Sequence, residues 1–290
     1  MKLRLRCALL GLAVVLRASA QVGVATYQYD NSRAGANAGE AILTRDNVNA
    51  SQFGKLFSYP VDGVVYAQPL YVPNVAIAGK GTHNVVYVAT EHDSVYAFDA
   101  DSNTGANSAP LWRTSFLDPN AGVTSFPGQD TGCSQIVPEI GISGTPVIDA
   151  ASRTIYLVAM TKETAGGSAS YVGRLHALDI GSGAEKPGSP VVIQAAVPGT
   201  GEGGATVTFQ AKSYKQRPGL LLLDGVVYTG WSSHCDIGQY HGWLMGYDAR
   251  TLQQVRVLKL LATIFAVAVL VLILGAAFYV IRRNPHLFHR

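Results

Sequence analysis

Charged residues are scarce in this sequence. They make up 14% of the 290 residues, whereas hydrophobic residues make up 48%. This balance excludes a disordered chain, because disorder goes with low hydrophobicity and high net charge. The first twenty and the last thirty-five residues contain no acidic residue, and nine of the 22 basic residues lie in them. The middle therefore holds 13 basic and 19 acidic residues, and this acidic balance argues against nucleic-acid binding.

Cysteine is also scarce, with only Cys7, Cys133 and Cys235 in the whole chain. No two cysteines are adjacent and no C-x-x-C-H run occurs, which excludes a vicinal disulfide and covalent haem attachment. Cys7 lies in a predicted leader, so Cys133 and Cys235 are the candidate disulfide pair in an oxidising compartment. Bridged and free thiols both stay open, because spacing does not show whether the two Cα atoms come within about 7 Å.

The N-terminus has the three parts of a secretory signal peptide. Basic residues 2–6 precede an apolar run over residues 7–16, and Ala18-Ser19-Ala20 forms a small-residue cleavage site. The sequence therefore predicts that residues 1–20 are a signal peptide removed after Ala20, and that the chain is exported.

The C-terminus contains the one long apolar run. Residues 260–281 carry no charge and are long enough to cross a hydrocarbon core about 30 Å thick. We expect residues 256–290 to hold one C-terminal transmembrane α-helix over 260–281 and a short tail. Arg282, Arg283 and Arg290 follow the span and Arg256 and Lys259 precede it, a slight bias that predicts an exported N-terminal domain and a cytoplasmic C-terminus.

A repeated pattern fills the middle of the chain. Its clearest copy, residues 85–105, has two β-branched or aromatic runs that are separated by polar residues and closed by a turn, which predicts a β-hairpin. Similar stretches occupy residues 154–183 and 226–251, and the aligned Tyr87, Tyr156 and Tyr228 are 69 and 72 residues apart. A proline-bearing strand precedes each copy and a less regular run follows it. One unit therefore predicts four antiparallel strands, the composition of a propeller blade.

The turn that closes the second copy reads A-x-D-x-x-S-G, through Ala177, Asp179 and Gly183, and looser forms occur around Asp99 and Asp248. In this turn and its strand context the sequence resembles the PQQ-like β-propeller repeat. That repeat is shared by quinoprotein dehydrogenases and by non-catalytic scaffolds such as the outer-membrane-assembly lipoprotein. The resemblance covers roughly residues 27–254 and implies an all-β fold, although one architecture hosts many functions.

The expected architecture is a partial β-propeller of about three four-stranded blades over residues 64–255, after an N-terminal extension with one strand over residues 21–63. The strands of the first blade are expected at residues 67–77, 84–89, 94–99 and 110–116. Residues 162–173 are expected to be a Gly/Ser-rich insertion, and residues 117–140 a long loop of the kind that often carries function.

Three blades are fewer than the four to eight of a typical propeller, and they leave two open edges. Another chain or the N-terminal strand could complete them, or the chain is a truncated propeller joined to an unrelated anchor. The abrupt change of composition near Val255 favours truncation or fusion. We expect a protein partner or a second propeller chain, membrane contact through residues 260–281, and no nucleic acid.

Loops on one face of such blades would collect most of the reactive side chains. They are Glu91, His92, Asp93, Cys133, Glu139, His234, Cys235, Asp236 and His241.

These residues allow two kinds of site. His234, Cys235 and His241 are ligand types that zinc or copper accepts, although their spacing matches no standard finger and hydrogen-bonded loop histidines are the alternative. The resemblance implies PQQ held with calcium and a carboxylate base, for which Glu139 and Asp236 are the only candidates. The alternative for both carboxylates is to fix loops by hydrogen bonds to backbone amides.

The leading hypothesis is a membrane-anchored, exported β-propeller module for binding or scaffolding, without assigned catalysis. One alternative is a PQQ-dependent alcohol or sugar dehydrogenase domain, and another is an incomplete propeller without activity of its own.

Overall fold

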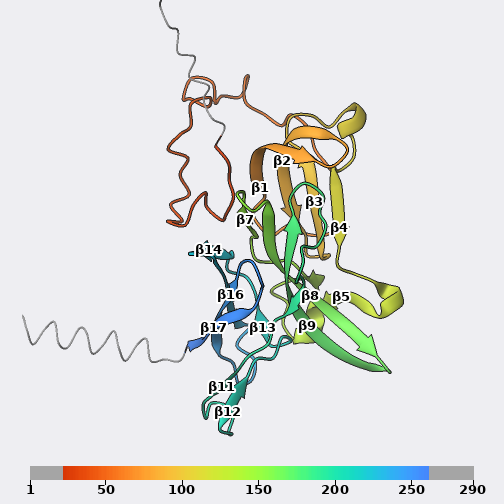
Figure 1. Ribbon diagram of the computed structural model, residues 1–290, viewed down its shortest axis with the longest axis vertical. Helices are drawn as coiled ribbons and strands as arrows, with labels where there is room; N and C mark the ends of the chain where they lie inside the picture. Colours follow the sequence, from red (N-terminus) through yellow and green to blue (C-terminus); the bar gives the residue numbers. More distant parts are fainter. Residues whose placement is uncertain (1–21, 261–290) are drawn as a thin grey trace, which may run out of the picture.

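A computed structural model describes residues 22–260 of the chain (Figure 1). The predicted signal peptide, all of the predicted span after Leu260 and the predicted tail lie outside the described residues. Within residues 22–260 the fold is all-β, with several antiparallel sheets and three short 3-10 turns. None of the helices described there is long and apolar enough to cross a membrane.

The first sheet confirms the four strands expected over residues 67–116. They follow one another in the order β1-β2-β3-β4, each antiparallel to the next. Their bounds are β1 Leu70–Ile77, β2 Gly81–Ala89, β3 Ser94–Asp99 and β4 Trp112–Ser115, with the 3-10 turn η1 Gly105–Asn107 between the last two. Every residue of β3 is buried, so both faces of this strand are covered.

The second sheet is built around a long hairpin, which corrects the expected insertion over residues 162–173. Strands β8 (Thr154–Ala165) and β9 (Ser168–Asp179) pair along their whole length, up to Ala165 opposite Ser168. Gly166 and Gly167 both have positive φ, as a two-residue hairpin turn of type I′ requires. The Gly and Ser residues therefore make a tight turn and exposed strand ends, not a loop.

The remaining strands of the second sheet include two from a segment expected to be irregular. The bounds are η2 Pro119–Ala121, β5 Val123–Pro127, η3 Gly128–Thr131, β6 Glu139–Ile140, β7 Val147–Asp149 and β10 Val191–Val192. Residues 117–140 were expected to form a loop, but they contain β5, which pairs with β8, and β6, which pairs with β5. Strand β7 lies in the proline-bearing run expected before the second copy, and β10 in the less regular run expected after it.

The third sheet extends past the boundary expected at Val255. Strand β17 (Gln254–Leu260) pairs with β16, so the sheet runs on to Leu260. The other strands are β13 Tyr214–Lys215, β14 Leu221–Leu223, β15 Val226–Ser233 and β16 Gly242–Asp248. A small separate hairpin, β11 Ala196–Pro198 and β12 Thr206–Thr208, precedes this sheet.

The N-terminal extension contains no strand over residues 22–63, which contradicts the one strand expected there. Its ladder contact is an isolated bridge between Val24 and Tyr71 of β1. From there the extension contacts all three sheets, at β1, at β7 and directly before β14. The Ala25 carbonyl accepts a hydrogen bond from Ile148 of β7, and Arg33 donates to the Leu220 carbonyl beside β14.

A second part of the extension, residues 57–65, lies on the outer face of the first sheet and is named the strap here. The Tyr59 ring stacks on Phe98 with centroids 4.3 Å apart, and its hydroxyl donates to the carbonyls of Ser102 and Asn107. The strap is held by side chains and not by a ladder, which explains why its alternating pattern does not produce a strand.

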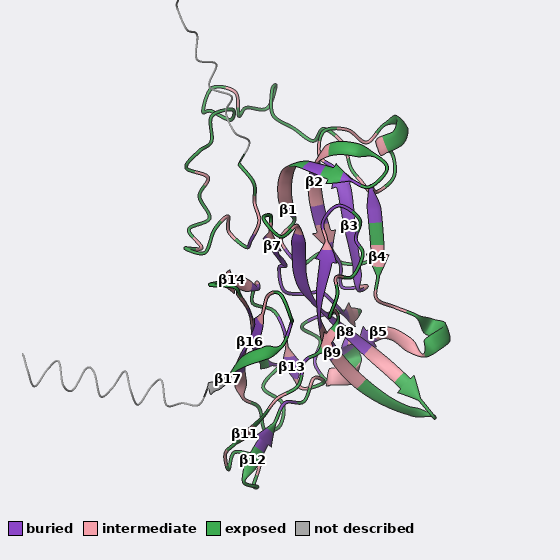
Figure 2. Ribbon diagram, viewed as in Figure 1, coloured by how far each residue is buried: buried purple, intermediate pink, exposed green. Residues whose placement is uncertain are grey.

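The core consists of two apolar clusters, one on each face of the second sheet (Figure 2). Leu157 and Ala159 of β8 face the first sheet, whereas Val158 and Met160 face the third. This alternation follows the two-residue period of a strand. The second sheet is therefore buried on both faces, while the first and third sheets each have one face that no other sheet covers.

Candidate functional site

A polar cavity of about 460 Å³ opens where segments from the N-terminal extension, the second sheet and the third sheet meet. Thr145 holds these segments together, because its carbonyl accepts from the Leu220 amide and its hydroxyl accepts from the Gln68 amide. The residues that line the cavity are Tyr27, Tyr66, Ser143, Thr145, Lys215, Arg217, Pro218, Gly219 and Ser232.

Two cations face this cavity. Lys215 and Arg217 are two residues apart in an extended segment, which places their side chains on the same side of the chain. Burial lowers the pKa of Lys215, and the nearby Arg217 charge lowers it further, against the opposing effect of Asp236. Within residues 22–260 neither cation has a carboxylate at ion-pair distance, and Lys215 donates only to Gln135.

A buried carboxylate lies behind the hydroxyl wall of the cavity. Glu91 is fully buried, and one of its oxygens accepts from the Gly141 amide at 2.7 Å and from the Ser143 hydroxyl at 3.0 Å. Burial raises the pKa of Glu91 to about 7, although both hydrogen bonds oppose the rise. Its second oxygen has no partner among the described residues. Glu91 therefore engages the proton of the Ser143 hydroxyl behind the cavity wall.

Asp93 lies next to Glu91 and is also fully buried. Its carboxylate accepts from the Met160 amide, which ties the first sheet to the second. Burial raises the pKa of Asp93 well above its usual value, and the charges of Glu91 and Glu139 act in the same direction. These two acids are structural groups between sheets, and they reach the cavity only through Ser143.

The structure brings some of the predicted loop residues together in pairs. Glu139 lies 2.9 Å from Nδ1 of His92, and Asp236 accepts from the Ser233 hydroxyl. Both carboxylates thus fix loops, but through side-chain donors and not through the backbone amides we expected. His241 lies 3.7 Å from Glu202.

Cys133 and Cys235 form a disulfide, with Cα atoms 5.8 Å apart, that links the loop after η3 to the loop after β15. Cys235 therefore offers no thiolate to a metal. His234 is 4% exposed, and burial followed by the Lys215 charge lowers its pKa to about 4. No group of three or more His, Cys, Asp or Glu side chains in the described range could hold a metal ion.

The calcium that the family resemblance implies is not matched by this donor set. Glu139 is paired with His92 and Asp236 with Ser233, so the two candidate carboxylates serve separate loops. The residues present therefore do not fit a calcium-bound quinone.

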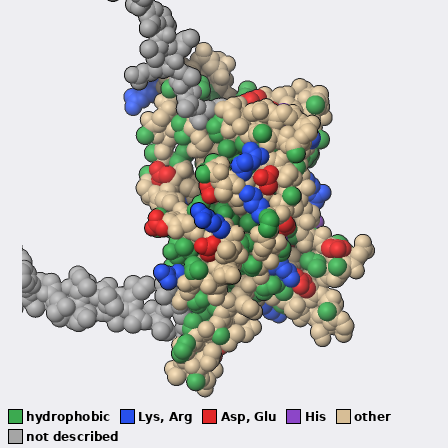
Figure 3. Space-filling model, viewed as in Figure 1, with side chains coloured by type: hydrophobic (Ala, Val, Ile, Leu, Met, Phe, Trp, Pro, Cys, Tyr) green, Lys and Arg blue, Asp and Glu red, His purple; other side chains and the backbone are tan. Residues whose placement is uncertain are grey.

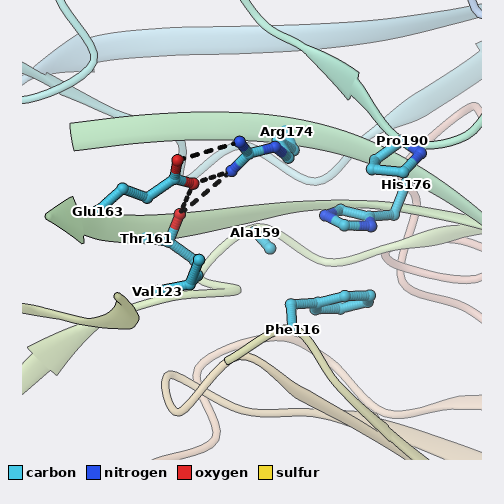
Figure 4. Close-up of a pocket in the computed structure, with 8 residues that line it drawn as sticks. All are labelled: Phe116, Val123, Ala159, Thr161, Glu163, Arg174, His176 and Pro190. Atoms are coloured by element: carbon cyan, nitrogen blue, oxygen red, sulfur yellow. Dashed lines mark hydrogen bonds and ion pairs between the residues drawn. The ribbon is translucent and has the colours of Figure 1, made fainter. Parts of the chain in front are cut away.

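A second, smaller cavity of about 210 Å³ lies beside β8 and β9 (Figure 4). Arg174 and Glu163 form an ion pair on one side of it. On the other side, the centroids of the His176 and Phe116 rings are 3.9 Å apart, and Nδ1 of His176 lies 2.6 Å from Oε1 of Glu185. Because each charged group already has a partner, this cavity offers less to a charged ligand than the first.

Five residues that line the first cavity were not predicted from the sequence: Lys215, Arg217, Tyr27, Tyr66 and Ser143. The available signal was the alternation Lys-Gln-Arg directly before the Pro218 strand. Comparison of the chain with protein-family models finds no match, and neither does a search of curated proteins.

Proposed function

We propose that the chain is an exported, membrane-anchored binding module of the β-propeller type, which holds a small multiply charged anion in the cavity where the N-terminal extension, the second sheet and the third sheet meet. The observation that carries this proposal is the pair Lys215 and Arg217, which share one polar cavity without a carboxylate partner in the described part of the chain.

The cavity wall supports an oxyanion ligand. An arginine can hold a carboxylate or phosphate through two parallel hydrogen bonds, and lysine adds a compact charge. Thr145 and Ser232 bring hydroxyl groups, whereas the Ser143 hydroxyl is engaged by Glu91, and Tyr27 and Tyr66 bring aromatic surface. On the face shown in Figure 3, acidic and basic side chains are interspersed, so the paired cations of the cavity are a local feature.

The propeller assignment is supported by the repeated unit. In each sheet the aligned tyrosine is paired on one side with an aliphatic residue of the strand before it and on the other with a small residue of the strand after it. Tyr87 pairs with Leu70 and Ala97 in this way. The equivalent pairs are Val147 and Ala177 for Tyr156, and Leu221 and Gly246 for Tyr228. Export and anchoring rest on the leader and the apolar span of the sequence, and a disulfide suits an oxidising compartment.

Calorimetric titration of the full chain with citrate tests this function. Each of Lys215→Gln and Arg217→Gln removes a charged hydrogen bond, worth about 1.5–3 kcal/mol, so each is expected to weaken binding about tenfold or more. Lys212→Gln is the matched control, because Lys212 lies 4.9 Å from the Tyr171 ring and does not line the cavity.

Two outcomes would contradict the proposal. If neither citrate nor inorganic phosphate binds the wild-type chain, the result favours the alternative that the chain is an incomplete propeller without activity of its own. If the chain oxidises an alcohol or aldose when supplied with PQQ and calcium, the dehydrogenase reading replaces it.

A further inference from the structure

One tyrosine contact joins each sheet to the next, and it occurs twice within the chain. Tyr87 of the first sheet donates its hydroxyl to the Ile180 carbonyl of the second sheet at 2.9 Å. Tyr156 of the second sheet donates to the Ala249 carbonyl of the third sheet at 2.8 Å. Ile180 and Ala249 each follow the aspartate of the turn that closes a repeat. The same donor position and the same acceptor position are thus used at both sheet interfaces.

Tyr228 is the third tyrosine of this series. It pairs with Leu221 of β14 and Gly246 of β16, which is the register of Tyr87 and Tyr156 in their sheets. Tyr87 and Tyr156 are each 2% exposed, whereas Tyr228 is only half-buried, because no further sheet follows it among the described residues. Tyr228 therefore has the donor position of the interlock without the acceptor.

The surface around Tyr228 is mostly apolar, with the exposed Arg256 of β17 beside it on the same face. Strand alternation and pairing put Leu221, Leu223, Val226 and Leu244 on the same face as Tyr228. None of them belongs to the two core clusters of the described residues, and Leu223 is 45% exposed. This face, named the open face here, has the side chains of a sheet interface.

The matching acceptor lies at the other end of the chain, in the first sheet. Asp99 accepts from the amides of Asp101 and Ser102, which makes the same kind of turn as at Asp179 and Asp248. The residue after it is Ala100, the equivalent of Ile180 and Ala249.

Ala100 lines a cavity of about 320 Å³ on the outer face of the first sheet, beneath the strap. The walls of this cavity are mostly apolar and include Val61 and Val65 of the strap and Val86 and Val88 of β2. The cavity has room for an aromatic ring, and the Ala100 carbonyl is the equivalent of the Ile180 and Ala249 carbonyls that accept a tyrosine hydroxyl.

We propose that a second copy of this chain docks head to tail on the open face, with Tyr228 entering the Ala100 cavity of the partner and donating to the Ala100 carbonyl. The occupant is a second copy because this chain carries both halves of the interlock at its opposite ends. They are the Tyr228 hydroxyl and the Ala100 carbonyl, which has no donor among the described residues. Tyr59 of the strap already donates to the nearby Ser102 and Asn107 carbonyls, so Tyr228 of the partner enters the cavity beside the Tyr59 ring. Two such contacts close a ring of six sheets, within the four to eight that propellers have. This inference rests on the proposed function only in treating each sheet as a blade.

Sedimentation of the full chain in mild detergent, over a range of concentrations, tests the inference. The wild type is expected to form pairs that dissociate on dilution. Leu223→Glu puts a charge into the interface and is expected to weaken pairing tenfold or more, and Tyr228→Phe several-fold. Val192→Glu is the matched control. The exposed fraction of Val192, 47%, is similar to that of Leu223, but Val192 lies on β10 of the second sheet. It should leave pairing unchanged.

Three results would overturn the inference. They are a wild type that stays monomeric at every concentration, open polymers in place of pairs, and pairs that Leu223→Glu does not weaken. The last result would assign pairing to another part of the chain. Circular dichroism of Leu223→Glu confirms that it is folded, and its citrate binding, expected to be unchanged, separates this test from that of the anion site.

Discussion

Replacing Glu91 by glutamine should make the protein more stable at neutral and alkaline pH. Glu91 is fully buried, and its pKa rises from the usual 4.5 to about 7, mainly because burial disfavours its charge. A carboxyl whose pKa is raised in the folded state contributes full stability below pH 4.5 and loses it as the pH rises through 7. At about 1.4 kcal/mol for each pH unit, the loss amounts to roughly 3 kcal/mol.

The assay is urea unfolding of both proteins between pH 4.5 and 8, followed by the fluorescence of the buried Trp231 and Trp243. The wild-type curve alone is not diagnostic, because His234, with its pKa lowered to about 4 by burial and Lys215, gains stability with rising pH over a similar range. The difference between Glu91→Gln and the wild type isolates Glu91. It should grow by roughly 3 kcal/mol from pH 4.5 to 8. A difference that stays constant with pH would refute the reasoning.

Two further predictions concern the connections between the sheets. Cys133 and Cys235 are separated by 102 positions, so replacing both by serine should lower the free energy of unfolding by about 2–4 kcal/mol, seen as a lower urea midpoint. An unchanged midpoint would show that the bridge does not constrain the unfolded chain. A Cβ on Gly141 would collide with the Glu91 carbonyl, so Gly141→Ala should lower the melting temperature by an amount equivalent to about 1–3 kcal/mol. Gly54→Ala, where a Cβ meets nothing within 4 Å, is its control, and equal effects of the two changes would contradict the packing described.

The strand pattern of the repeats was predictable from the sequence. The β-branched and aromatic runs around Tyr87, Tyr156 and Tyr228 all form strands, because such runs fit a pleated surface with at least one buried face. Composition was misleading around Gly166 and Gly167. Gly and Ser there indicated a loop, whereas two positive-φ glycines make a hairpin turn and let long strands continue on either side.

The N-terminal extension shows the opposite error. The alternation around Phe57 and Tyr59 indicated a strand, but the side chains of the strap bind carbonyls and rings of the first sheet without a ladder. Alternation reports which side chains are buried, and it does not report whether a neighbouring strand is present to pair with.

The candidate site was only partly predictable. The scarcity of cysteine and the predicted export made Cys133 and Cys235 the candidate pair, which the structure shows bridged. Reactive residue types, however, drew attention to His92, Glu139 and Asp236, which hold loops. Lys215 and Arg217 are recognisable as site residues only in the folded chain, where Ser143 and Tyr27, which are distant in sequence, line the same cavity. A cavity between sheets depends on how the sheets pack, and a single sequence does not specify that packing.

The most direct test of the anion site is a crystal structure of the chain grown with citrate. The account predicts density for citrate in the cavity, in contact with both Lys215 and Arg217. Citrate bound elsewhere, with this cavity holding only water, would contradict it.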